Sequence, residues 1–465
     1  MSLNESLLAT GSGSADAVPL PRLRAGVDVA AVGAEHGEDL ICLFDRQDPT
    51  AGQVVMTRAG LFLASLLDGS RTASGVRAAF ALRSGSALRR SDLEAFVEQL
   101  DRANLLESAR FRERQRRIAE AFRRSATRPA VHAGGAYPGE PAALRAFLDA
   151  SYTLPGGPGC PPGPVTHPSR RALIAPHIDL HRGRHSYAWG YRALAESVPA
   201  DLYVLLGTCH LPMRRPFAAT TLAYDTPFGP VTGDPEFLEQ LQRRAPFDIF
   251  EDELSHRREH ALEFQAVYLR HLGHSGEDGP ASVVSILCVP PGSVGDGDTP
   301  RDDPATEQFI QALAAAVASH DRQQEARGIG EQFIQALAAA VAEDGRRVCY
   351  VAGADFAHVG PQFGDPVPVD GRFAEHVWAG DLAMLELAAA GDADGFYRQV
   401  VQEPAGPGMS GESMAVGGPR RICGLAPMYA LLRLVEGSSG SVLHYDQWID
   451  QGGAGSVTFG CVLFD

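Results

Sequence analysis

The chain has 465 residues, a formal net charge of −16 at pH 7 and 45% hydrophobic residues. This length predicts more than one domain, because single hydrophobic cores stop growing near about 250–300 residues. All 41 basic residues are arginine, which excludes enzymes that need a Schiff-base lysine or a P-loop lysine. The negative charge argues against nucleic-acid binding, which depends on excess cations that neutralise phosphates.

The sequence contains no run of the ~18–20 apolar residues that a membrane-spanning helix needs, and no basic segment precedes the short apolar stretch at the N-terminus. We therefore expect a cytoplasmic protein with no membrane partner. The seven cysteines include no C-x-x-C pair. Their odd number and spacing disfavour both a disulfide framework and a cysteine-rich structural zinc site.

Residues 1–20 are small and polar and predict a disordered tail, whereas 21–108 predict a small α+β domain. Its expected elements are two strands and two helices, at 39–48, 53–60, 61–82 and 91–106. The motif LLDGSRT, the helix that follows it and the pattern L...NLLES resemble the small winged-helix modules of the PqqD-like kind, and the resemblance implies a peptide ligand. A DNA-binding winged helix and a purely structural cap are the alternatives.

Residues 109–128 predict a basic linker helix. The stretch 110–124 carries seven arginines against two glutamates. Such a charge run is typical of a solvated helix, with a contact to an anion or a nucleic acid as the alternative.

Strand and helix patterns alternate from residue 129 to residue 465, which predicts one α/β sandwich. Four apolar runs have the composition of buried strands with helices on both faces, at 171–176, 201–208, 281–290 and 346–356. The last two strands are expected at 441–449 and 456–465. Helices are expected at 183–198, 234–244, 259–272, 371–390 and 422–436.

The segment EQFIQALAAAVA occurs twice, at 307–318 and 331–342. Identity over this length indicates a recent local duplication. We expect one copy to form the helix before the strand at 346–356. The low-complexity insertion near 292–330 is expected to be an exposed extension.

Three of the four predicted buried strands are followed directly by a histidine, namely His177, His210 and His358. Ligands of open α/β sheets bind beyond the carboxyl ends of the strands, so three imidazoles at that edge can meet around a metal. A lone histidine is more often a hydrogen-bonded polar residue than a ligand. Three equivalent strand ends favour a site.

Carboxylates lie close to these histidines in the sequence. Asp355 precedes His358 by three residues, and Asp179 follows His177 by two. Asp179 could orient a ring nitrogen or supply a ligand oxygen.

Two further groups carry suitable chemistry. His260 and Glu263 are three residues apart in a predicted helix and are expected on one face, with a solvated helix start as the alternative. Cys423 is expected to open the last long helix, where the amide-rich N-terminus favours the thiolate. A small buried hydrophobic residue is the alternative for Cys423.

Seven motifs in one order resemble the MEMO family, whose bacterial members are also called protein B of the AmmeMemoRadiSam system. They are HAGGAYPG, APHIDLHRG, LLGTCH, TPFGPVTGD, REHALEFQ, GADFAHVG and ICGLAPM. The resemblance covers about 129–465. It implies the α/β/α sandwich of the class III extradiol dioxygenases, here preceded by the winged-helix-like domain.

The resemblance implies an iron or copper site on His177, His210 and Cys423, and zinc suits the same donors. In a catalytic site, His358 would carry protons, with Asp355 orienting it and His260 assisting. The remaining pocket residues are expected to be His132, Asp179 and Glu263. The family also implies a radical-SAM protein and an AMMECR-type protein as partners.

This chain departs from the family pattern at two places. Ile178, Asp179 and Leu180 stand where the family often has Ala-Gly-Tyr, and Gln265 stands where it often has a second histidine. A cysteine in place of the dioxygenase carboxylate argues against plain ring cleavage. We expect a metal-dependent oxidoreductase or an accessory protein of a radical-SAM-associated modification system. The alternative is a non-enzymatic peptide- or protein-binding module with a dioxygenase-like pocket.

Overall fold

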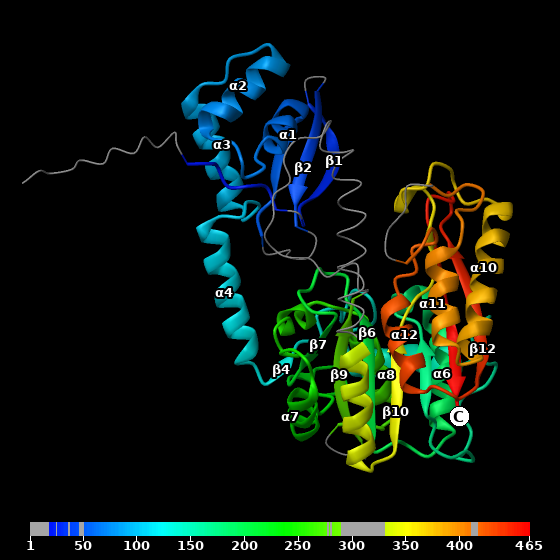
Figure 1. Cartoon of the computed structure of the whole chain (residues 1–465). Coiled ribbons are helices and arrows are strands. Elements are labelled where there is room, and N and C mark those ends of the chain that lie inside the picture. Colours follow the sequence, from blue (N-terminus) through cyan, green and yellow to red (C-terminus); the bar gives the residue numbers. More distant parts are fainter. Residues whose placement is uncertain are drawn as a thin grey trace, which may run out of the picture. The chain divides into compact units, whose positions relative to one another are not determined.

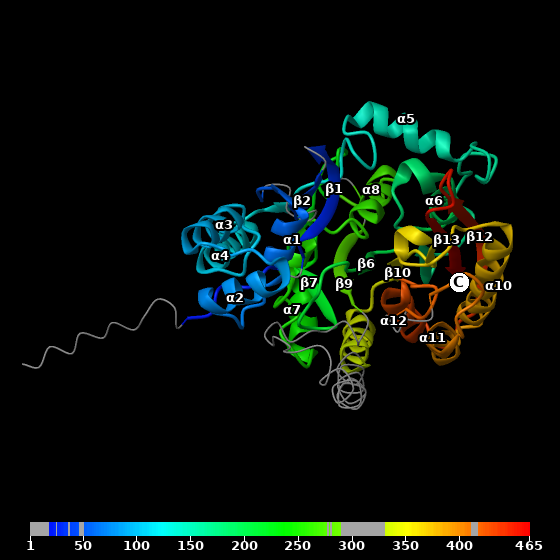
Figure 2. The same cartoon turned by 90° about the horizontal axis from the view of Figure 1, so that it is seen from above.

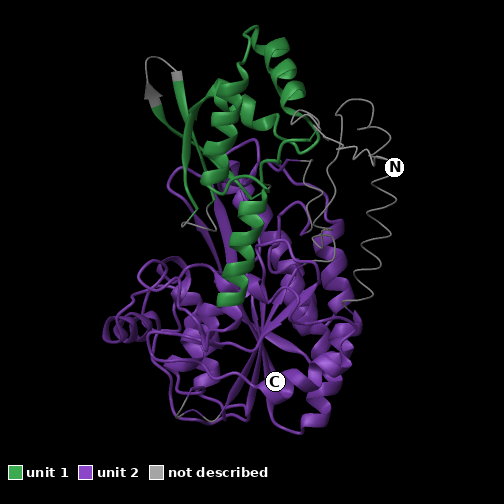
Figure 3. Cartoon of the chain, turned by 90° about the vertical axis from the view of Figure 1, so that its left-hand side faces the viewer, with its two compact units in different colours: residues 1–121, 298–310 green, residues 122–297, 311–465 purple. Residues whose placement is uncertain are grey.

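The computed structural model describes residues 18–24, 26–35, 38–45, 51–276, 279, 281–289, 331–410 and 417–465. The chain divides into two compact units, residues 1–121 with 298–310 and residues 122–297 with 311–465 (Figure 3). Most of the expected tail, the insertion near 292–330 and the first copy of the duplicated segment lie outside the described residues.

The first unit contains an antiparallel sheet with the strand order β1-β2-β3 (Figure 1). Its strands are β1 (Asp28–Glu35), β2 (Glu38–Phe44) and β3 (Val54–Thr57). The helices are α1 (Arg58–Ser65), α2 (Ala73–Ser84), α3 (Arg90–Arg102) and α4 (Ala109–Arg123). The single helix expected at 61–82 is two helices, because the Thr72 hydroxyl accepts a hydrogen bond from Gly75 N at 3.3 Å and caps a new helix. Strand β1 was not predicted.

The second unit is built on an eight-stranded mixed sheet with the order β11-β13-β5-β10-β6-β9-β7, and β12 pairs with β13. The parallel centre consists of β5 (Ala172–Ala175), β10 (Val348–Gly353), β6 (Leu202–Thr208) and β9 (Ser282–Cys288). The antiparallel strands are β7 (Phe217–Thr220), β11 (His358–Val359), β12 (Gly440–Ile449) and β13 (Ser456–Phe464). The four predicted buried strands are therefore the parallel centre of the sheet. A separate short pair joins β4 (Thr127–Arg128) to β8 (Ala223–Tyr224).

Helices cover both faces of this sheet (Figure 2). Alternate residues of β5 belong to different cores: Ala172 and Ile174 pack on one face, and Leu173 and Ala175 on the other. The first face carries α7 (Pro235–Arg244), helical residues 331–344, α10 (Gly371–Ala389), α11 (Ala393–Gln402) and α12 (Leu425–Leu434). The second carries α5 (Pro141–Ser151), α6 (Leu180–Ala195) and α8 (Glu263–His271). The expected α/β fold class is confirmed.

Two helices begin later than predicted, and both differences affect the candidate site. Helix α8 begins at Glu263 rather than near residue 259, and α12 begins at Leu425 rather than near residue 422. The residues before each helix therefore lie in turns. No helix in the described part of the chain has the length and apolar character to cross a membrane.

Candidate metal centre

Three neighbouring parallel strands end beside one another at one edge of the sheet. His177 follows β5, Asp355 follows β10 and His210 follows β6, and β10 lies between the other two strands. The ring centroids of His177 and His210 are 5.2 Å apart, with the ring planes at 83°. The strand order thus brings together two imidazoles that are 33 positions apart in the sequence.

His260 joins the two strand-end histidines. Its ring centroid lies 5.3 Å from that of His177 and 4.8 Å from that of His210. One nitrogen atom from each of the three rings lies within 4.8 Å of the others, so they could hold one metal ion. His260 does not share a helix face with Glu263 as expected. Because α8 begins at Glu263, His260 lies in the preceding turn and faces the histidines, whereas Glu263 forms a buried ion pair with Arg128.

Cys423 lies against the same cluster, with its Sγ atom 3.3 Å from Nε2 of His177. Two donors on a four-coordinate ion, at bond lengths of ~2.3 Å for sulfur and ~2.1 Å for nitrogen, are about 3.6 Å apart. The observed separation therefore suits two ligands of one ion. Gly424 permits this approach, because a Cβ atom there would lie 2.5 Å from the carbonyl oxygen of Asp355.

The thiol of Cys423 does not have the low pKa expected of a helix N-terminus. Burial raises the pKa of this thiol well above its ordinary value, and the negative charge of Asp355 raises it further. The residue also lies two positions before α12, outside the helix itself. A cation that binds the sulfur must therefore displace its proton.

His177 is oriented for ligation by the backbone. Its Nδ1–H donates to the carbonyl oxygen of Gly353 at 3.0 Å, so the lone pair is on Nε2, the atom that faces Cys423. Burial lowers the pKa of His177 well below its ordinary value, and the two neighbouring imidazoles lower it further. The ring is thus neutral at pH 7, the form that binds metals.

Asp355 and His358 are held by different partners. One oxygen of Asp355 accepts hydrogen bonds from the backbone N–H groups of His177 at 2.8 Å and Ile178 at 3.1 Å. His358 instead donates from Nδ1 to the carbonyl oxygen of Phe356 at 3.2 Å. The orienting bond expected from Asp355 to His358 is therefore supplied by a backbone carbonyl. Burial lowers the pKa of His358 to about 4, against the opposing charge of Asp355.

Glu259 is a buried carboxylate to which the sequence analysis assigned no role. Its oxygens lie 3.1 Å from Nδ1 of His210 and 3.1 Å from Nδ1 of His260. Burial alone would raise the pKa of Glu259, but the two imidazoles and their hydrogen bonds hold it well below its ordinary value. The pKa of His210 is lowered by burial, yet the charge and hydrogen bond of Glu259 outweigh that effect and raise it. The sequence signal that could have identified Glu259 is its position directly before His260.

His132 borders the cluster, and its ring centroid lies 5.7 Å from that of His260. Its Nε2–H donates to the carbonyl oxygen of Arg258 at 2.9 Å. Glu263, expected in the pocket, is fully buried beside Arg128 and accepts a hydrogen bond from the backbone N–H of His132 at 3.0 Å. Glu263 therefore supports the loop that carries His132.

Asp179 and Gln265 stabilise the backbone on either side of His177. Asp179 caps α6 by accepting a hydrogen bond from the backbone N–H of Arg182 at 3.2 Å, and it pairs with the Arg182 side chain. Gln265 donates to the carbonyl oxygen of Pro176 at 2.7 Å and accepts from the Tyr191 hydroxyl at 2.6 Å. The amide of Gln265 thus stabilises the end of β5 from the buried side.

The cluster is accessible from one side. The side chain of His177 is 2% exposed, whereas those of His210 and His260 are 38% and 32% exposed. A cation would therefore approach past His210 and His260, with His177 and Cys423 behind it.

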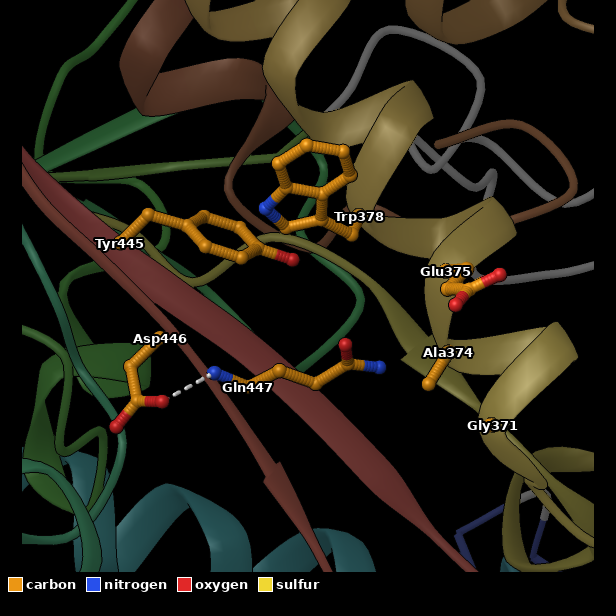
Figure 4. A pocket seen from close by; sticks show the side chains of 7 residues that line it. All are labelled: Gly371, Ala374, Glu375, Trp378, Tyr445, Asp446 and Gln447. Atoms are coloured by element: carbon orange, nitrogen blue, oxygen red, sulfur yellow. Dashed lines mark hydrogen bonds between the residues drawn. The ribbon is translucent and has the colours of Figure 1, made fainter.

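A separate hollow of about 360 Å³ lies between α10 and β12 (Figure 4). The lining residues are Gly371, Ala374, Glu375, Trp378, Tyr445, Asp446 and Gln447. Trp378 is 50% exposed there, and a carboxylate oxygen of Asp446 accepts a hydrogen bond from the backbone N–H of Gln447 at 2.7 Å. This hollow includes none of the clustered histidines.

The sequence is similar to proteins of one family. Residues 128–290 match the family model described as "Memo-like protein". A MEMO1 family protein of Aquifex aeolicus is 27% identical over 70% of this chain and 74% of that protein. One from Thermus thermophilus is 26% identical over 80% of this chain and 93% of that protein. A third, from Methanococcus maripaludis, is 32% identical over 31% of this chain and 52% of that protein.

A solved structure titled as an uncharacterized protein from Escherichia coli K12 matches with 15% identity and a TM-score of 0.29. It covers 63% of this chain and 100% of that chain. A similarity this low carries no argument about the fold.

Proposed function

From its similarity to the Memo-like family, we propose that this chain belongs to that family and is a metal-binding protein with a mononuclear site on His177, His210 and Cys423. The observation that carries the proposal is the 3.3 Å separation between Cys423 Sγ and His177 Nε2, with the imidazole of His210 from the end of β6 beside them. The sulfur of Cys423 and Nε2 of His177 come from distant parts of the chain, and their separation is close to that of two ligands on one metal ion.

The donor set selects the class of metal. Neutral imidazoles and a thiolate suit iron, copper or zinc, whereas magnesium and calcium prefer oxygen ligands. We propose iron first and copper second. When bound, such an ion supplies Lewis-acid or one-electron chemistry.

The residues around the site provide a proton acceptor and a rigid frame. The pKa of His358 is about 4, so its ring is neutral at pH 7, and the bond from Nδ1 to Phe356 leaves Nε2 unprotonated. That nitrogen can take a proton from a bound molecule. Asp355 holds the backbone of His177 and Ile178 in place.

The test is metal content and affinity. Protein purified without added metal is analysed for iron, copper and zinc, and then titrated anaerobically with Fe(II) and Cu(I). The proposal predicts one ion per chain and weaker binding in His177→Ala and Cys423→Ser. Equal affinities in wild type and Cys423→Ser would remove the sulfur from the ligand set. A sub-stoichiometric metal content that is the same in wild type and His177→Ala would refute the proposed site.

A second candidate function is peptide binding by the first unit. A hollow of about 640 Å³ there is lined by Ala31, Asp39, Ile41, Arg58, Leu61, Phe62 and Ser65. Its mixed apolar and ion-paired lining favours a peptide ligand, in keeping with a PqqD-like winged helix.

The partners proposed for the whole chain are a radical-SAM protein and an AMMECR-type protein. Co-purification with such partners, lost in Phe62→Asp but retained in His177→Ala, is the expected result.

A further inference from the structure

We propose that Glu259 is a positioning residue that holds His210 and His260 in the same tautomer, with the lone pair on Nε2. His260 is then a third imidazole donor to the metal. This inference rests on the proposed metal site and extends its ligand set. The structural basis is that one buried carboxylate contacts the same ring nitrogen of both histidines.

The contacts determine which nitrogen of each ring carries the proton. Nδ1 of His210 lies 3.1 Å from both oxygens of Glu259, and Nδ1 of His260 lies 3.1 Å from Oε1. An ionised carboxylate only accepts hydrogen bonds, so Nδ1 of His210 carries the hydrogen, and the equal distance at His260 favours a hydrogen on its Nδ1 as well. In the neutral form, which is the one that binds a metal, each imidazole has a single N–H group, so the lone pair of both rings is on Nε2.

The ring geometry places these two lone pairs on the same side of the stacked rings. The rings of His210 and His260 stack at 4.8 Å with an interplanar angle of 17°, and the same carboxylate binds one end of each. Both Nε2 atoms therefore lie on the side away from Glu259. The ring of His177 stands nearly perpendicular to both, at 83° and 87°. One nitrogen atom from each of the three rings lies within 4.8 Å of the others.

Glu259 is itself held firmly. Its oxygens accept hydrogen bonds from the backbone N–H groups of His210 and His260, each at 2.8 Å, and of Ala261 at 3.2 Å. Its backbone carbonyl accepts from the buried guanidinium of Arg128 at 2.5 Å. The carboxylate thereby ties the end of β6 to the turn before α8. Carboxylates that orient metal-binding histidines in this way typically change metal affinity by ~10–100-fold.

Glu259→Gln tests the proposal because glutamine retains one acceptor and replaces the other with an NH2 donor. Either orientation of the amide places its NH2 group against Nδ1 of at least one ring, which favours the opposite tautomer in that ring. We expect Co(II) affinity to fall by about 10–100-fold, and His260→Ala to weaken it as well. The matched control is Glu253→Gln, a buried carboxylate of the same segment that binds the Thr220 hydroxyl at 2.9 Å. That control should retain wild-type affinity.

A second measurement does not depend on metal binding. Nitrogen-15 NMR of the metal-free wild type, recorded at a pH at which both rings are neutral, should show both rings protonated on Nδ1. In Glu259→Gln, at least one ring should become protonated on Nε2.

The outcomes separate the two proposals. A wild type that binds no Co(II) but has both rings protonated on Nδ1 would refute the metal site and leave the role of Glu259 in ring orientation intact. A wild type that binds Co(II) with the same affinity as Glu259→Gln or His260→Ala would overturn the inference. If Glu259→Gln does not fold, Nε2 protonation of either ring in wild type, or unchanged affinity in His260→Ala, still overturns it.

Discussion

Cys423 Sγ lies 3.3 Å from His177 Nε2, although 246 positions separate the two residues in the chain. The contact joins the end of β5 to the turn before α12. It depends on the position of His177 at the end of β5, on Gly424 and on the carboxylate of Asp355. Each of these residues can be substituted separately.

Asp355→Ala should destabilise the protein by about 2–4 kcal/mol. The substitution leaves the buried N–H groups of His177 and Ile178 without their acceptor, and unsatisfied buried donors carry a penalty of ~1–3 kcal/mol each. Asp355→Asn retains one acceptor oxygen and should lose less than half as much. Urea unfolding of the two variants beside wild type measures the difference. Equal losses in both would show that the carboxylate oxygen is not what holds these groups.

Gly424→Ala should destabilise the protein by about 1–3 kcal/mol and weaken metal binding together with it. The added Cβ atom would meet the carbonyl oxygen of Asp355 at 2.5 Å and the side chain of Ala354 at 2.6 Å, which forces the Cys423 turn away from the sheet. The matched control is Gly371→Ala at the start of α10, where a Cβ atom meets nothing within 4 Å. Thermal unfolding should show a lower Tm for Gly424→Ala alone.

His256 should make stability depend on pH. The ring is fully buried, donates from Nε2 to the carbonyl oxygen of Ala218 at 2.9 Å and accepts from the Tyr224 hydroxyl at 2.8 Å. Burial lowers the pKa of His256 from 6.5 to about 3. Between these values the unfolded chain binds the extra proton, so stability is full above pH 6.5 and falls as the pH decreases towards about 3.

The measurement for His256 is the free energy of unfolding as a function of pH. Its slope between about pH 6.5 and 5 should be smaller in His256→Gln than in wild type, by up to ~1.4 kcal/mol per pH unit. The exposed His167→Gln serves as the control and should leave the slope unchanged. A slope that His256→Gln does not alter would contradict the assignment.

Arg420→Met should destabilise the protein by about 3–5 kcal/mol. The guanidinium is buried between Asp381 and Glu403, and its removal leaves the buried carboxylate of Asp381 and the partly buried one of Glu403 without this cation. Its backbone carbonyl also accepts a hydrogen bond from the N–H of His358 at 2.8 Å, so the loss should extend to the site. Adding Asp381→Asn to Arg420→Met should recover part of the stability in urea unfolding. No recovery would show that the ion pair is not the source of the loss.

Much of the second unit could be predicted from local patterns. The runs at 171–176 and 201–208 are β5 and β6, because buried strands are continuously apolar whatever lies beside them. His177 and His210 then follow at the strand ends. Helices α5 and α11 were not predicted, and the helix boundaries near residues 259 and 422 were placed too early. The displaced boundary at α8 is why His260 and Glu263 were placed on one face.

The sequence by itself determined the charge balance and the absence of lysine, since both are properties of composition. It also determined the buried strands and the histidines that follow them, because apolar patterns report local burial. Only the tertiary structure decided which donors meet. The insertion of β10 between β5 and β6 places Asp355 between two histidines, and the close approach at Gly424 brings in Cys423. The turn before α8 directs His260 inward and leaves Glu259 beneath both rings. These relations depend on strand order and backbone approach between distant segments, which no local pattern encodes.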